Sequence, residues 1–214
     1  MTGKIILVGG EKGGPGKSTV AQNLAVYLIN QGFDTLLYDA DVQGTSKDWV
    51  DERSENPKLT QVTCVQRSGK IKDSLLDLVG KYDAIVVDAG GHDNEALRSA
   101  MAAADLMLIP LRPKRRDLKT LEHVEELVSL ASNFNEKLVV RTVITQCPTL
   151  PSQTKRILDA KEACESFGLK PLNAITCNRN VYDDCDEGGL SVFECKDKKA
   201  IEEMSAIAKE FLGV

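Results

Sequence analysis

The chain has 214 residues, of which 42% are hydrophobic and 28% are charged, so it is long enough for one domain that buries roughly 70% or more of its unfolded surface. Its formal net charge of −5 provides no overall attraction to nucleic acid or to an anionic membrane, so binding of either kind requires a local patch. No apolar run has the length of a bilayer-spanning helix, and a strand-like run begins almost at the N-terminus, so we expect no signal peptide and a cytoplasmic protein.

Apolar runs of strand length alternate with amphipathic segments along the whole chain. The predicted strands are Lys4–Val8, Thr35–Tyr38, Val62–Gln66, Ala84–Val87, Leu106–Pro110, Leu138–Ile144 and Pro171–Ile175. The predicted helices are Ser18–Gln31, Ile71–Gly80, Asn94–Ala103, Leu118–Ser132, Gln153–Phe167 and Lys198–Phe211. Several strand runs are continuously apolar, which is typical of strands covered on both faces. The alternation predicts an α/β fold with a doubly wound, mostly parallel sheet flanked by helices, in a single domain that spans residues 1–214.

The glycine-rich segment Gly9–Thr19 lies between the first predicted strand and the first predicted helix. Its glycines let backbone N–H groups approach a phosphate without obstruction by Cβ atoms, and the helix N-terminus adds its positive dipole end. Lys17 has the position that contacts β- and γ-phosphate oxygens, and the Ser18 hydroxyl the position that ligates Mg²⁺. The strict pattern has glycine where this chain has Glu11, and a second lysine, Lys12, follows.

Two acidic clusters follow predicted strands at the edge where parallel sheets bind their ligands. Asp39 and Asp41 come directly after the second strand, and Asp88 follows the apolar run that ends at residue 87. An aspartate at the end of a strand beside a phosphate loop holds a Mg²⁺-bound water, which is the role we expect for Asp88. We expect Asp41 to orient the attacking water and Asp39 to support the metal shell. Gly91 has the position to offer its N–H group to the γ-phosphate.

Together these motifs resemble those of the deviant Walker A ATPases of the ParA/MinD superfamily, with the nearest likeness to small ParA-type plasmid partition ATPases. The signature Lys-Gly-Gly-x-Gly-Lys-Ser/Thr is matched by Lys12–Ser18. The motif Asp-x-Asp-Pro-Gln is matched by Asp39–Gln43, with Val42 in place of the proline. Weaker matches lie in segments 109–113, 117–118, 174–176, 179–181 and 191–194, so the resemblance extends from about residue 4 to residue 212.

The resemblance implies an ATPase that uses Mg²⁺ and hydrolyses ATP to ADP in a nucleotide-sandwich homodimer. Lys12 is then the lysine that crosses the dimer interface to the partner's ATP and stabilises developing phosphate charge, as an arginine finger does. The catalytic residues implied are Lys12, Lys17 and Asp41. The nucleotide-binding residues implied are Lys12, Gly13, Gly14, Gly16, Lys17, Ser18, Thr19 and Gly91, and the metal-binding residues are Ser18, Asp39 and Asp88.

The resemblance also implies partners: nonspecific DNA bound by the ATP-loaded dimer, which makes the protein nucleoid-associated, and a small centromere-binding or adaptor protein that stimulates hydrolysis. The function implied is partition of plasmid DNA or positioning of another cargo. The densest basic runs are Lys114–Arg116, with Lys119 close behind, and Lys196 with Lys198 and Lys199. Either run is a candidate DNA surface, and a solvated face is the simpler interpretation of both.

Two alternative functions remain open at this stage. A MinD-like ATPase directed by membranes ends in a membrane-binding helix with a basic polar face. The last predicted helix here carries Glu202, Glu203 and Glu210, which disfavours membrane contact and favours packing on the sheet. A metabolic synthase of related fold uses ATP to activate a carboxylate and generally lacks a lysine equivalent to Lys12.

The six cysteines are scattered without a Cys-x-x-Cys pair, which argues against zinc or iron–sulfur sites. We expect all of them to be reduced, because disulfides are rare in a reducing compartment. A base pocket for adenine is expected between the loop after Ile144 and the stretch from Thr176 to Asn180.

Overall fold

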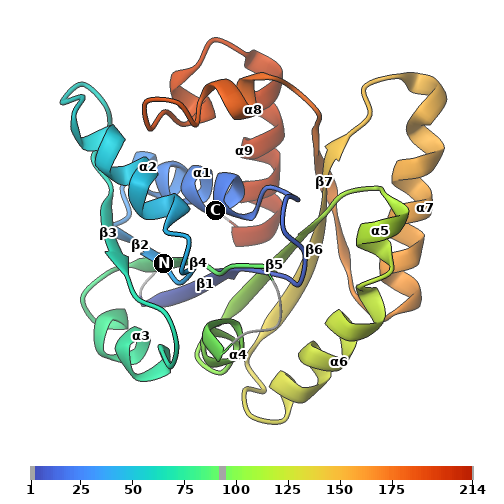
Figure 1. The fold of residues 1–214 in the computed structure, drawn as a ribbon, viewed down its shortest axis with the longest axis horizontal. Coiled ribbons are helices and arrows are strands. Elements are labelled where there is room, and N and C mark those ends of the chain that lie inside the picture. Colours follow the sequence, from blue (N-terminus) through green and yellow to red (C-terminus); the bar gives the residue numbers. More distant parts are fainter. Residues whose placement is uncertain (1–2, 92–94, 214) are drawn as a thin grey trace.

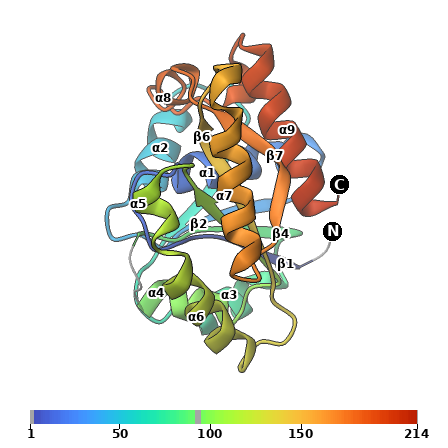
Figure 2. The same cartoon turned by 90° about the vertical axis from the view of Figure 1, so that its right-hand side faces the viewer.

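Seven parallel strands form one twisted sheet at the centre of the computed structural model, which describes residues 3–91 and 95–213 (Figure 1). Their order across the sheet is β3-β2-β4-β1-β5-β6-β7. The strands are β1 Lys4–Val8, β2 Thr35–Asp39, β3 Thr63–Gln66, β4 Ala84–Asp88, β5 Leu106–Leu111, β6 Val139–Cys147 and β7 Pro171–Cys177. The predicted fold class is confirmed: helices cover both faces of a parallel sheet, in one domain (Figures 1 and 2).

The helices of the described residues include all six predicted ones, with ends shifted by up to three residues, and three that were not predicted, α2, α5 and α8. The helices are α1 Lys17–Asn30, α2 Thr45–Ser54, α3 Lys72–Val79, α4 Glu95–Met101, α5 Arg115–Leu118, α6 Leu121–Ser132, α7 Thr154–Ser166, α8 Val181–Asp184 and α9 Lys198–Leu212, with 3-10 turns η1 Pro151–Gln153 and η2 Val192–Glu194. The helix predicted from Leu118 to Ser132 begins three residues later, as α6, and the short helix α5 precedes it and shares only Leu118 with the predicted range. Helix α2 was not predicted, because its sequence is polar and shows little apolar periodicity. Asn94, the first residue of one predicted helix, lies outside the described residues.

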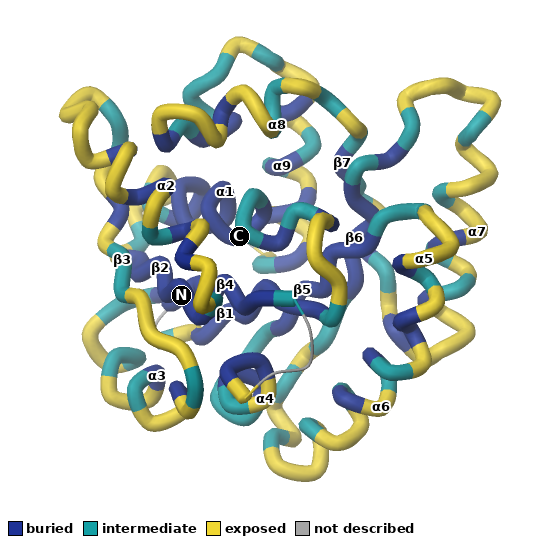
Figure 3. Tube along the Cα trace, viewed as in Figure 1, coloured by how far each residue is buried: buried dark blue, intermediate teal, exposed yellow. Residues whose placement is uncertain are grey.

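Alternate residues of each central strand enter two separate cores. In β1, Ile5 and Leu7 face the core under α3, α4, α6 and α7, while Ile6 and Val8 face the core under α1, α2 and α9. All four side chains are at most 2% exposed, and Figure 3 shows the strands as the most buried part of the chain. Burial on both faces explains why these strands appear in the sequence as continuous apolar runs.

The last helix, α9, packs on the sheet as expected. Its apolar residues Met204, Ile207 and Phe211 are buried in the same core as α1. Two of its glutamates serve the edge strand β7: Glu210 accepts N–H bonds from Asn173 and Ala174 (2.7 and 2.8 Å), and Glu203 accepts one from Cys177 (3.0 Å). These bonds satisfy donors that an edge strand otherwise presents to solvent. Within the described ranges, no helix is long and apolar enough to cross a membrane.

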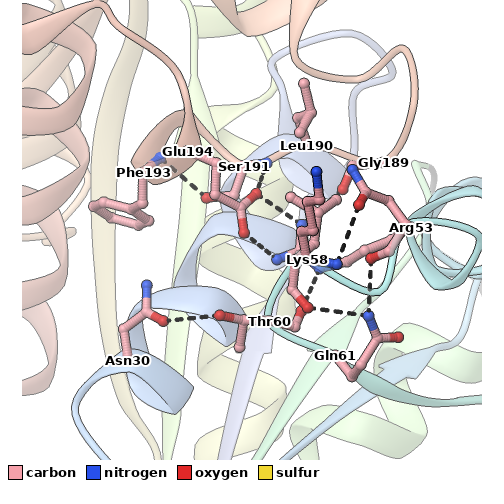
Figure 4. A network of polar contacts seen from close by, with 12 residues as sticks. Asn30, Arg53, Lys58, Thr60, Gln61, Gly189, Leu190, Ser191, Phe193 and Glu194 are labelled. Carbon is pink, nitrogen blue, oxygen red and sulfur yellow. Dashed lines mark hydrogen bonds and ion pairs between the residues drawn. The ribbon is translucent and has the colours of Figure 1, made fainter.

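Helix α2 is held by a buried arginine near its C-terminal end. Arg53 is 1% exposed, donates to the carbonyl oxygens of Thr60 (2.6 Å) and Gly189 (2.7 Å), and pairs with both carboxylate oxygens of Glu194. Figure 4 shows Arg53 and Glu194 pointing toward one another from α2 and η2. The guanidinium also lies 5.0 Å from the ring centroid of Trp49, one turn earlier on α2. The network therefore joins α2 to a segment more than 130 residues later in the chain.

The expectation that all cysteines are reduced is wrong for one pair. Cys185, at the end of α8, forms a disulfide with Cys195, which directly follows η2. The segment between them turns back on itself, and sequence spacing alone does not reveal such a return. Cys64, Cys147, Cys164 and Cys177 are free.

Glu194→Ala is expected to lower the free energy of unfolding by about 3 kcal/mol, because it leaves the buried Arg53 guanidinium without its counter-charge. Chemical denaturation followed by circular dichroism measures this loss. The matched control is Glu187→Ala, which removes an exposed glutamate of the same segment and is expected to change stability by less than about 0.5 kcal/mol. Equal stability of the two variants would show that the Arg53 network does not hold α2.

Candidate functional site

The glycine-rich loop (residues 9–19) joins β1 to α1 at the carboxyl edge of the sheet. Gly14 and Gly16 have φ values of 89° and 83°, which side chains with a Cβ rarely adopt, so glycine is needed at both positions. Gly16 is the N-cap of α1, and Val20 N donates to its carbonyl oxygen at 2.9 Å. The first free N–H groups of α1 therefore lie beside the loop, as an anion-binding loop requires.

The two lysines of the loop differ sharply in environment. Lys17 is 7% exposed, and its Nζ donates to the carbonyl oxygen of Lys12 at 2.6 Å. Burial lowers the pKa of Lys17, and the nearby carboxylates of Asp88 and Asp41 oppose this effect. The Lys12 side chain is exposed, and its ammonium group has no partner among the residues described. One lysine is thus buried in the site, and the other is exposed to solvent.

The strand register brings the predicted carboxylates to one level. Asp88 pairs with Val8 on β1 and with Asp39 on β2, so Asp88 lies directly beside the start of the glycine-rich loop and Asp39 lies at the same level one strand further away. Asp88 is 1% exposed, and one of its oxygens accepts a bond from Ser46 Oγ at 2.7 Å. Burial raises the pKa of Asp88 to about 6, against hydrogen bonds from Ser46 and Ser18 that favour the charged form. Asp88 is therefore a buried carboxyl group with a need for positive charge.

Asp39 and Asp41 shape the turn that follows β2. Asp39 is fully buried, and its two oxygens accept N–H bonds from Asp41 (3.0 Å) and Lys47 (2.8 Å). Burial raises the pKa of Asp39, and these bonds oppose the rise. Asp41 is partly exposed and accepts a bond from Gln43 N at 3.0 Å.

The segment that follows β4 passes close to both the turn and the loop. A Cβ atom on Gly90 would lie 2.6–2.9 Å from the carboxyl atoms of Asp41. One on Gly91 would lie 2.9 Å from Gly13 N and 3.1 Å from the carbonyl carbon of Lys12. Glycine fits these close approaches, which leave little room for a Cβ atom at either position. A movement of this segment would therefore displace Asp41 and the glycine-rich loop as well.

The acidic and hydroxyl oxygens at this edge fit a hard divalent cation. The Ser18 hydroxyl lies near enough to Asp88 to favour the charged form of its carboxyl group, and both are ligand types that Mg²⁺ prefers. Residues 3–91 and 95–213 contain no cluster of three or more His, Cys, Asp or Glu side chains that could hold a metal ion alone. A Mg²⁺ ion bound through one or two protein ligands, with phosphate oxygens and waters completing its shell, matches this donor set.

Three site residues were missed by the sequence analysis. Ser46, at the start of α2, is fully buried and bonded to Asp88. Arg112, directly after β5, makes a two-pronged ion pair with the buried Asp117 (2.8 and 3.0 Å) and lies 3.2 Å from a Cβ position on Gly14. Ser46 belongs to no motif of the sequence. Segments 109–113 and 117–118, which contain Arg112 and Asp117, resemble the family only weakly and do not indicate the ion pair between them.

A cavity opens beside the glycine-rich loop where the base pocket was expected. It is lined by residues of the loop and α1, of the carboxyl ends of β6 and β7, of α8 with the turn before it, and of α9: Pro15, Gly16, Thr19, Val20, Thr145, Gln146, Thr176, Cys177, Asn178, Arg179, Tyr182, Asp183 and Met204. Gln146 has a φ of 49°, and its Nε2 donates to Gly14 O at 2.8 Å. Thr145 Oγ1 donates to Pro15 O at 2.8 Å. These bonds attach the cavity wall to the loop itself.

The opposite wall of this cavity is organised by a glutamate of α9. Glu203 accepts bonds from Arg179 (2.8 and 2.9 Å), Tyr182 Oη (2.9 Å) and Cys177 N (3.0 Å). Arg179 is therefore neutralised within the fold and is not a surface cation. Glu203, whose charge disfavours membrane contact, therefore also holds together the residues of this cavity wall.

Comparison with known proteins agrees with the site. Residues 6–192 match the model of the CobQ/CobB/MinD/ParA nucleotide binding domain. The "Maintenance of carboxysome distribution protein A" of Halothiobacillus neapolitanus is 28% identical over 204 residues, with 94% of this chain and 93% of that protein covered. The "Chromosome partitioning protein ParA" of Myxococcus xanthus is 28% identical over an alignment of 252 positions, with 98% and 88% covered.

Among solved structures, the complex of Cyanothece McdA with ATP superposes with a TM-score of 0.80 at 16% identity, and covers 99% of this chain and 96% of that one. The likeness at this identity concerns the fold, and it agrees with the all-parallel sheet described above. The sequence match spans the glycine-rich loop and all three aspartates. The chain belongs to the CobQ/CobB/MinD/ParA family of nucleotide-binding domains.

Proposed function

We propose that this protein is a ParA-type ATPase that binds Mg·ATP, forms a nucleotide-sandwich homodimer and hydrolyses ATP to control the position of a cargo, with nonspecific DNA as its ATP-dependent support. The observation that carries the proposal is the pair of lysines in one loop. Lys17 is buried beside Asp88 and Asp41, while Lys12 is exposed with no partner in the described chain. Lys17 then contacts the nucleotide of its own subunit, and Lys12 contacts the nucleotide of the facing subunit.

The dimer is inferred from the exposure of Lys12. An exposed ammonium group with no partner in the described part of its own chain can stabilise phosphate charge in a dimer, where the nucleotide of the facing subunit lies against it. Gly13 and Gly14 next to it are exposed, so a second copy of the loop has access to this face. In the dimer each Lys12 contacts the ATP of the partner, and hydrolysis depends on assembly.

The nucleotide is held by the loop and by the cavity beside it. Backbone N–H groups of Gly13, Gly14, Gly16 and the start of α1 surround the phosphates, with Lys17 and Thr19 beside them. Adenine enters the cavity between Gly16 and the segment from Thr176 to Asn180. The bonds from Gln146 and Thr145 to the loop support this assignment, because base and phosphates then contact one connected unit.

Ser18 and Asp88 hold Mg²⁺, with Asp39 supporting the shell through the turn it caps. When bound, the ion neutralises charge on the β- and γ-phosphates. Asp88 contributes a carboxyl group whose pKa is raised by burial, and the bond from Ser46 fixes the direction in which that group points. Asp41 orients the attacking water beside Gly90, and Gly91 offers its N–H group toward the γ-phosphate.

The proposal names the class of the cargo and not its identity. Relatives named for carboxysome distribution and for chromosome partition support positioning of a large object, and an adaptor protein bound to that object is the expected stimulator of hydrolysis. A membrane-directed function has little support, because the apolar face of α9 is buried against the sheet. A metabolic synthase gives no use for an exposed Lys12.

Lys12→Ala is expected to lower the ATPase rate about 100-fold or more, because a cation at developing phosphate charge contributes on that order. Turnover with and without duplex DNA, and mass by light scattering with ATP, test the variant. The matched control is Lys72→Ala, an exposed lysine on α3, which is expected to keep wild-type turnover. ATP-independent monomers with undiminished turnover in Lys12→Ala would refute the sandwich dimer and favour a synthase.

Asp41→Ala is expected to dimerise with ATP but to hydrolyse it about 100-fold more slowly, since orientation of the attacking water is lost while phosphate binding remains. Light scattering and phosphate release on the same sample separate the two properties. Normal turnover would exclude Asp41 from the reaction. Binding to anionic vesicles, with none to DNA, would replace the leading function by a membrane-directed one.

Asp88→Asn is expected to stabilise the protein at pH 7 in the absence of Mg²⁺ and nucleotide. Asp88 has a pKa of about 6 when folded, above its ordinary 3.8, so the folded protein retains a proton that the unfolded chain loses between these values. The Asp88 contribution to unfolding free energy therefore falls as pH rises from about 4 to about 6, by about 3 kcal/mol. Asparagine does not titrate, so denaturation with EDTA from pH 4.5 to 7.5 should show a difference between variant and wild type that grows and then levels. Parallel profiles would contradict the assignment.

A further inference from the structure

Four basic side chains line an open groove between α5 and α7. They are Lys114, Arg115 and Lys119 from around α5, and Arg156 from α7, with Asp159 as the acidic member. The two helices lie side by side at one end of the sheet in both views (Figures 1 and 2). Arg156 joins a cluster that the sequence displays only as a run near residue 115, because the turn from β6 into α7 returns the chain to α5.

The cations of this groove are uncompensated. Lys114, Arg115, Lys119 and Arg156 are exposed, and no ion pair to any of them occurs within the described ranges. Three arginines that lie partly or fully inside the fold are neutralised, by contrast: Arg53 by Glu194, Arg112 by Asp117 and Arg179 by Glu203. In a protein of net charge −5, unpaired positive charge gathered in one groove marks a surface for a polyanion.

The groove is adjacent to the nucleotide site. The buried Asp117 of α5 accepts three bonds from Arg112, and the guanidinium of Arg112 lies against Gly14 of the glycine-rich loop. Helix α5 is thus attached to the loop through one ion pair, while its lysines and arginines face solvent. A ligand in the groove contacts α5, and ATP in the loop lies beside Arg112, which is paired with Asp117 of the same helix.

The second basic run lacks this arrangement. Lys196, Lys198 and Lys199 are exposed, but they surround Asp197, whose carboxylate accepts N–H bonds from the first turn of α9. Positive charge there is diluted by an acid fixed among the lysines. The structure therefore separates the two runs that the sequence left equal.

We propose that the α5–α7 groove binds the phosphate backbone of duplex DNA. The inference rests on the proposed function, and it identifies the surface that carries the DNA-binding step. Flexible lysines and arginines on an open surface contact phosphates without reading bases, which suits a sequence-independent support. Asp159 places one negative charge in the groove and so lowers its affinity for a polyanion.

The test is fluorescence anisotropy of a labelled random-sequence duplex with ATP over a series of NaCl concentrations. Lys114→Ala/Lys119→Ala/Arg156→Ala is expected to weaken binding at least about tenfold and to reduce the slope of log K against log salt by about 2 to 3. The matched control, Lys196→Ala/Lys198→Ala/Lys199→Ala, changes net charge by the same amount and is expected to bind within about twofold of wild type. Asp159→Asn is expected to bind about two- to threefold more tightly.

Dimer formation with ATP and basal ATPase rate are measured for every variant, so loss of folding is distinguished from loss of DNA contact. Loss of DNA binding in the control triple variant, with none in the groove triple variant, overturns this inference and leaves the proposed function intact. A wild type that dimerises and hydrolyses ATP but binds no duplex overturns the DNA part of both. If the groove variant loses binding to polyglutamate and keeps binding to duplex, the groove is a site for an acidic protein segment and the inference is overturned.

Discussion

A carboxyl group with almost no access to water lies at the carboxyl end of the central strands, and much of the site is arranged around it. Asp88 is level with Val8 and Asp39 because β1, β4 and β2 pair in parallel and in register. Burial of that group is unfavourable unless charge or hydrogen bonds compensate it, and Ser46, Ser18 and the nearby Lys17 do so only in part. The remaining need for positive charge is the physical property that makes this edge of the sheet suitable for Mg²⁺ and a polyphosphate.

That arrangement depends on helix α2, which has little apolar surface of its own. Ser46 and the N–H group of Lys47 reach Asp88 and Asp39 only if the start of α2 lies close to β4 and β2. The far end of the helix is fixed by Arg53, through Glu194 and the carbonyl oxygen of Gly189 (Figure 4). A buried ion pair of this kind adds little net stability but is costly to break, so it specifies position more than it stabilises the fold. The C-terminal segment thereby takes part in a site whose motifs all lie in the first half of the chain.

The distribution of charge follows the same logic. Arginines that position elements are paired with carboxylates inside the fold, and Glu203 and Glu210 are used to satisfy N–H groups of the edge strand β7. The acidic total of the chain is therefore a poor guide to its surface. Unpaired cations collect in the α5–α7 groove and at Lys12, and both positions border the glycine-rich loop.

The sequence by itself determined the sheet, most helices, the phosphate loop and the three aspartates. Each of these has a local cause: continuous apolar runs for strands buried on two faces, glycines for tight turns, and acids directly after strands. Helix α2 was not predicted, because its sequence is polar and its position depends on Arg53 and on contacts with residues far along the chain. Tertiary structure alone decided the bond from Ser46 to Asp88, the Arg112–Asp117 pair, the Cys185–Cys195 disulfide and the gathering of Arg156 with Lys114. The Arg112–Asp117 pair lies within one turn of the chain. Each of the other contacts joins segments that are separated in the sequence and are brought together by the packing of the layers, which no local pattern of residues encodes.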